Sequence, residues 1–139
     1  MVAGMRPVLD AGEVVFCTTA DGALARKAQA HALGSFREAE GVSLILPSAA
    51  AEALGFPVDL PMRRIELSVN SALDGVGLTA AVASALAGER IPCNIVAAFH
   101  HDHVFVPAGL AERALTILEA LQADAARNGL PFRPRGAGA

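Results

Sequence analysis

The chain has 139 residues, the size of one ordinary domain or two very small ones. Apolar residues make up 53% of it, but many of them are alanines, which bury little surface area. The aromatic residues are six Phe, and the sequence contains no Trp or Tyr. With a formal net charge of −3 and few aromatic rings, the composition argues against a protein that binds nucleic acid.

The first half predicts a buried strand, a weakly marked helix, a hairpin and a short helix. Val14–Cys17 is apolar and β-favouring, which is typical of a buried strand, and Glu40-Gly41 separates two strand-like runs, as in a hairpin. An Ala-rich stretch between them has only a weak apolar stripe, and Pro47-Ser48 opens a last short helix. In chain order these elements are expected at residues 14–17, 18–32, 33–38, 42–46 and 47–55.

The second half predicts a strand, a helix, two strands and a helix. Ile65 and Leu67 alternate with polar residues, the pattern of a strand with one wet face. Apolar residues then recur at helical spacing until Gly88, and Pro92 begins the next strand, where a missing N–H is tolerated. The five elements are expected at residues 65–69, 78–88, 93–99, 103–106 and 107–121.

This order predicts an α+β fold of the ferredoxin-like βαββαβ type, but residues 62–122 lack the final strand. The segment 123–139 contains prolines, glycines and three arginines, so we expect a flexible basic tail there instead of a strand. Because an open strand edge invites association, the N-terminal half is expected to cover it. We therefore predict two small βα halves, 9–61 and 62–122, that share one interface.

The segment 70–79 joins a strand to a helix and is the first candidate for a ligand site. Gly75 and Gly77 let the backbone approach a ligand, and the helix start beyond them suits a carboxylate because its N–H groups are unpaired. Ser71 and Thr79 offer hydroxyls, and Asp74 could hold an amino group, so an amino acid fits this set. A plain glycine-containing connection explains the same residues equally well.

His101-Asp102-His103 is the second candidate. In an extended hairpin the two histidines project to one face and Asp102 to the other. Two imidazoles could form half of a metal site, and a metal-dependent enzyme centred on these residues is the rival prediction. Zinc normally takes at least three protein ligands, and the sequence has no second cluster of His or Cys. A polar hairpin whose Asp102 binds turn amides is the favoured interpretation.

The sequence contains no recognisable catalytic motif, so we expect a protein that is not an enzyme and needs no cofactor. A Gly-x-Ser-x-Gly elbow is absent, and the distance along the chain between Cys17 and Cys93 disfavours a disulfide or a cysteine-based zinc site. The N-terminus lacks the pattern of a secretion signal, and no segment approaches the roughly 20 apolar residues of a membrane helix. A cytoplasmic location without membrane contact is expected.

Five segments of the sequence resemble the ACT domain. They are Val15–Thr18, Ser35–Glu38, Asn70–Ala81, Ile91–Val96 and His101–Pro107. The longest of them is similar to the strand–loop–helix of that family. With a match over roughly Leu9–Leu121, the chain most resembles small bacterial proteins of unknown function that are built from two ACT-like halves.

The resemblance implies a regulatory module that binds a small ligand, commonly an amino acid, where paired ACT-like units meet. It also implies pairing of sheets, either between a degenerate half at 9–61 and the half at 62–122 or between the chains of a homo-oligomer such as a dimer. A third interpretation is an interaction module that pairs with a partner through its sheet edge. The ligand-binding residues expected from the loop and the resemblance are Ser71, Leu73, Asp74, Gly75, Val76, Gly77, Leu78, Thr79, Asn94, Ile95 and Val96.

Overall fold

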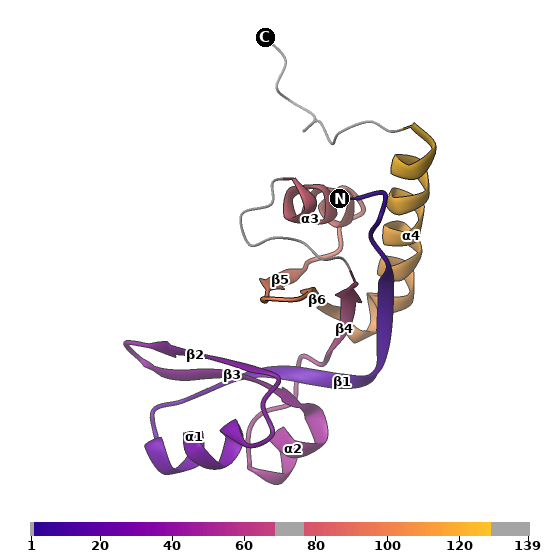
Figure 1. Cartoon of the computed structure of the whole chain (residues 1–139). Coiled ribbons are helices and arrows are strands. Elements are labelled where there is room, and N and C mark those ends of the chain that lie inside the picture. The colour runs from indigo at the N-terminus through magenta and orange to yellow at the C-terminus, as the bar shows by residue number, and fades with distance from the viewer. Residues whose placement is uncertain (1, 69–76, 129–139) are drawn as a thin grey trace. The chain divides into compact units, whose positions relative to one another are not determined.

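The computed structural model describes residues 2–68 and 77–128 (Figure 1). Contacts divide the chain into two compact units. The C-terminal unit combines Met1–Asp10 with Arg63–Ala139, and the inserted unit is Ala11–Met62. The chain of the C-terminal unit is thus interrupted by the inserted unit, and strand β1 (Pro7–Thr19) contributes residues to both.

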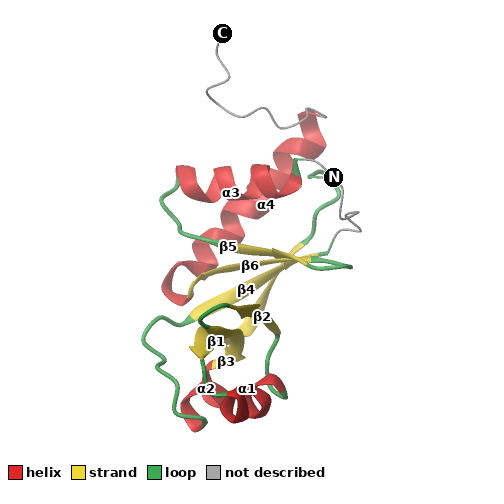
Figure 2. Ribbon diagram, turned by 90° about the vertical axis from the view of Figure 1, so that its left-hand side faces the viewer, coloured by secondary structure: helices red, strands yellow, loops and turns green. Residues whose placement is uncertain are grey.

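The inserted unit has three strands and two short helices. The elements are the later part of β1, α1 (Gly22–Gln29), β2 (Gly34–Glu38), β3 (Gly41–Pro47) and α2 (Ser48–Ala53). The strands are antiparallel in the order β2-β3-β1, and the predicted hairpin is confirmed, with Glu38 opposite Gly41. Both helices lie on one side of these strands (Figure 2), over a core that includes Val15, Leu44 and Leu46.

The C-terminal unit contains the strand, helix, strand, strand and helix that the sequence predicts. These are β4 (Met62–Leu67), α3 (Leu78–Gly88), β5 (Asn94–Ala97), β6 (Asp102–Pro107) and, after a 3-10 turn η1 (Ala108–Leu110), α4 (Ala111–Asn128). The strand order is β1-β4-β6-β5, and the Ser68 N–H donates to the Arg6 carbonyl at 3.0 Å. The first residues of β1 therefore supply the missing edge strand, and the predicted α+β ferredoxin-like class is confirmed.

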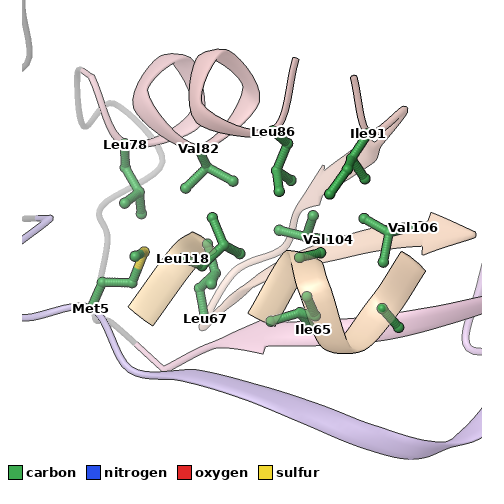
Figure 3. Close-up of a cluster of buried hydrophobic side chains, with 12 residues drawn as sticks. Met5, Ile65, Leu67, Leu78, Val82, Leu86, Ile91, Val104, Val106 and Leu118 are labelled. Atoms are coloured by element: carbon green, nitrogen blue, oxygen red, sulfur yellow. The ribbon is translucent and has the colours of Figure 1, made fainter. Parts of the chain in front are cut away.

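Helices α3 and α4 cover one face of this sheet (Figure 2). Leu78, Val82 and Leu86 recur at helical spacing and point down from α3 into the core, as Figure 3 shows. Fully buried alanines at 111 and 114 allow α4 to pack closely. The remaining large side chains of the core are Met5, Ile65, Leu67, Ile91, Val104, Val106 and Leu118.

Two neighbouring arginines of β4 are bound to β1. Arg63 Nε and Nη2 donate to the Asp10 carbonyl at 3.0 and 2.8 Å, and Arg64 Nε donates to Asp10 Oδ2 at 2.7 Å. The Nη1 atom of Arg63 also lies 3.5 Å from Glu112 Oε1. Because Asp10 is the last residue of β1 in the C-terminal unit, these bonds fix that strand beside β4.

The largest differences from the predicted boundaries lie at the two ends. Strand β1 begins at Pro7, well before the apolar run from Val14, because its first residues pair with a strand distant in sequence. Helix α4 continues to Asn128, into the segment 123–139 that was expected to be flexible. Its last turn is supported by a bond from Asn128 Nδ2 to Asp124 Oδ1 at 2.8 Å.

Candidate functional site

The start of α3 is the described part of the predicted loop. β4 ends at Leu67 and α3 begins at Leu78, so ten residues, 68–77, connect them. Of the predicted ligand-binding residues in this region, the structure describes Gly77, Leu78 and Thr79. The others lie outside the described residues: Ser71, Leu73, Asp74, Gly75 and Val76.

Gly77 precedes α3 in a left-handed conformation, with a φ of 101°. A side chain would have open space there, so the backbone conformation and not crowding favours glycine. The Gly77 carbonyl accepts the first helical bond from the Ala81 N–H at 2.9 Å. Because glycine has no side chain, the N-cap position offers no acceptor to the N–H groups of the first turn.

The helix α3 also has no side chain whose charge could offset the positive end of its dipole. It contains no acidic residue, and Leu78–Gly88 has no charged side chain at all. Leu78 is buried in the core and holds the helix start against the sheet, whereas Thr79 is exposed. Among the described residues no side chain caps this first turn, and backbone N–H groups together with the positive end of a helix dipole favour a carboxylate at such a position.

The three predicted site residues on β5 do not share one face of the sheet. Ile95 lies opposite Val104 and packs against the core beneath the helices. Because side chains alternate along a strand, Asn94 and Val96 lie on the other face, where both are exposed. Only Ile95 therefore lies on the side that α3 covers.

His101-Asp102-His103 follows the predicted alternation. His101 Nε2 lies 3.6 Å from Glu66 Oε1, on the face of the sheet opposite α3 and α4. Asp102 has the same parity as Val104 on β6 and is only 5% exposed, which places its side chain on the helix-covered face. Among the described residues no turn amide donates to Asp102, so the turn contact favoured from the sequence is not found.

The two histidines lie in a partly buried and mixed electrostatic environment. Burial lowers the pKa of His103, the Arg64 guanidinium and His101 lower it further, and Glu66 and Asp102 oppose these effects. The Nδ1 atoms of both imidazoles are buried, with no hydrogen-bond partner in the described part of the chain. Within residues 2–68 and 77–128, no group of three His, Cys, Asp or Glu side chains is placed to hold a metal ion.

The two cysteines are free and poorly suited to nucleophilic chemistry. Cys17 is buried in the inserted unit, and Cys93 is half-buried against the core of the C-terminal unit, just before β5. Burial raises the pKa of each thiol and so disfavours the reactive thiolate.

The inserted unit has an equivalent strand-to-helix connection, but its helix start is closed. Only Ala20 and Asp21 separate β1 from α1. The Asp21 carboxylate accepts from Ala23 N at 2.9 Å and from Leu24 N at 3.4 Å, so it occupies the first-turn N–H groups. The N-cap position that is a glycine in α3 is thus a capping aspartate in α1.

Asp102 is a buried acid that the sequence pattern alone did not single out, whereas Asp74 was expected to bind a ligand. The signal was present, because Asp102 has the parity of Val104 and Val106, both of which are fully buried. Alternation along β6 alone therefore predicts that this carboxylate lies on the core side of the sheet.

Comparisons with known proteins agree with this architecture. Residues 1–63 and residues 61–120 each match a family described as ACT domain. A protein of unknown function from Vibrio cholerae, described as a possible transport protein, is 38% identical over 88% of this chain and 93% of that chain, with a TM-score of 0.77. No curated protein matches the chain.

More distant structures share the fold. A protein from Agrobacterium tumefaciens is 17% identical over 85% of this chain and 89% of that one, with a TM-score of 0.62. The regulatory subunit of aspartate kinase from Thermus flavus is 14% identical over 83% and 95%, with a TM-score of 0.59. None of the helices in the described ranges combines the length and apolar character needed to cross a membrane.

Proposed function

Because the chain belongs to the ACT-domain family, whose members are typically regulatory and ligand-binding, we propose that it is a non-catalytic protein that binds an amino acid. The site proposed is the strand–loop–helix at residues 70–79 of the C-terminal unit. The observation that carries the proposal is the start of α3, where the N-cap residue Gly77 has no side chain to accept from the first-turn N–H groups.

The proposed role of the helix start is to bind the carboxylate of the ligand. The N–H groups of Leu78, Thr79 and Ala80 precede the first residue whose N–H is bonded within the helix, Ala81. A ligand carboxylate there would accept hydrogen bonds and interact with the positive end of the dipole. The absence of charge along α3 leaves this attraction uncompensated by the helix's own side chains.

The first test is thermal unfolding of the full chain in the presence of each proteinogenic L-amino acid at millimolar concentration. A ligand at 100 times its dissociation constant should stabilise the folded state by about 2.7 kcal/mol, and so raise Tm. If no amino acid raises Tm, the amino-acid proposal is contradicted.

A substitution at the exposed Thr79 tests the position of the site. In Thr79→Glu the new carboxylate lies in the first turn of α3, where it should stabilise the ligand-free helix by about 0.3–1 kcal/mol and compete with the ligand. The amino-acid-induced rise in Tm should therefore shrink. Ser84→Glu adds the same charge at an exposed position in the middle of α3 and should leave the ligand-induced rise unchanged.

We also propose that the protein acts as a homo-oligomer, most simply a dimer, in line with the pairing expected of ACT-like sheets. Size-exclusion chromatography with light scattering measures the mass directly. A monomer mass at micromolar concentration, with and without the amino acid, would contradict this part of the proposal.

A further inference from the structure

We draw no further inference here: the strongest candidate, the side-chain cluster of Glu66, His101 and His103 on the face of the C-terminal unit's sheet opposite α3 and α4, carries nothing because no group of three such side chains within residues 2–68 and 77–128 is placed to hold a metal ion and nothing in the structure shows what else would bind there.

Discussion

The inserted unit and the C-terminal unit share one order of strands and helices but treat the start of their first helix differently. In the inserted unit two residues connect β1 to α1, and Asp21 caps the helix. In the C-terminal unit ten residues connect β4 to α3, and Gly77 provides no cap. The same framework thus occurs once with a helix start capped by an internal carboxylate and once with a glycine at the N-cap position.

Under the proposed function, this difference would give one fold a structural copy and a binding copy. A side-chain cap stabilises a helix at every moment, and the same N–H groups cannot then bind a ligand. In α3 the N-cap residue Gly77 contributes no such stabilisation and does not compete for these donors. The close approach of Gly41 to the Thr19 carbonyl adds to the closure of the inserted unit, because a Cβ at Gly41 would lie 2.4 Å from that oxygen.

The largest expected effect comes from the separate cores of the two units. Leu118 and Leu46 are both fully buried, one in each core, so Leu118→Ala and Leu46→Ala should each lower the free energy of unfolding by about 2–5 kcal/mol. Amide hydrogen exchange should accelerate in the C-terminal unit for Leu118→Ala and in the inserted unit for Leu46→Ala. Identical exchange patterns in the two variants would show that the units do not have independent cores.

Gly41→Ala tests whether the start of β3 needs a residue without a side chain beside Thr19. Gly41 has a φ of 147°, and its missing side chain is what allows β3 to start against Thr19, so the substitution should destabilise the protein by about 1–3 kcal/mol. Denaturant unfolding measures the change. Gly12→Ala is the control, because a Cβ there meets nothing within 4 Å and its stability should remain close to wild type.

Asp21→Ala removes the cap that distinguishes α1 from α3. The N–H groups of Ala23 and Leu24 lose their acceptor, and we expect a loss of about 0.5–2 kcal/mol in the free energy of unfolding. Asp21→Asn retains a capping oxygen and should stay within a few tenths of a kcal/mol of wild type. Equal stability of the alanine and asparagine variants would contradict the role of the cap.

The smallest effect expected is an acid sensitivity specific to the C-terminal unit. The pKa of His103 is lowered in the folded protein by burial and by Arg64, so below its usual value of 6.5 the unfolded chain binds the proton more readily. Stability should therefore fall as the pH drops from 7.5 through 6.5 toward the folded pKa, and then level off. Denaturant unfolding at pH 7.5 and 5.5 should show a smaller fall for His103→Gln than for wild type. His31→Gln, at an exposed position of the inserted unit, should retain the wild-type fall.

Local patterns were sufficient to predict the elements of the C-terminal unit and the alternation around His101 and His103. The apolar residues of α3 and the polar–apolar alternation of β4 depend only on near neighbours in sequence. The weakly marked helix expected at 18–32 is present as α1. The position where it begins is explained by its Asp21 cap and not by its apolar stripe. The start of α3 could be predicted because Gly77 and the uncharged helix are visible in the sequence, whereas the ligand site there stays a prediction.

Contacts between distant residues were not predictable in the same way. The first residues of β1 have no strand pattern of their own and become a strand by pairing with β4. Arg63 and Arg64 bind their acceptor at Asp10, more than fifty positions away, and no local pattern indicates that contact. The faces of Asn94 and Asp102 depend on the register between β5 and β6, which fixes which residues lie under the helices.

The most direct test of the account is amide hydrogen exchange, followed by NMR, with and without each L-amino acid that raises Tm. The account predicts slower exchange at the amides of Leu78, Thr79 and Ala80 when the amino acid is bound. It predicts no change at Ala23 and Leu24, whose N–H groups are already occupied by Asp21. Slower exchange at α1, or unchanged exchange at the start of α3 under saturating ligand, would contradict the assignment of the site to the open helix start.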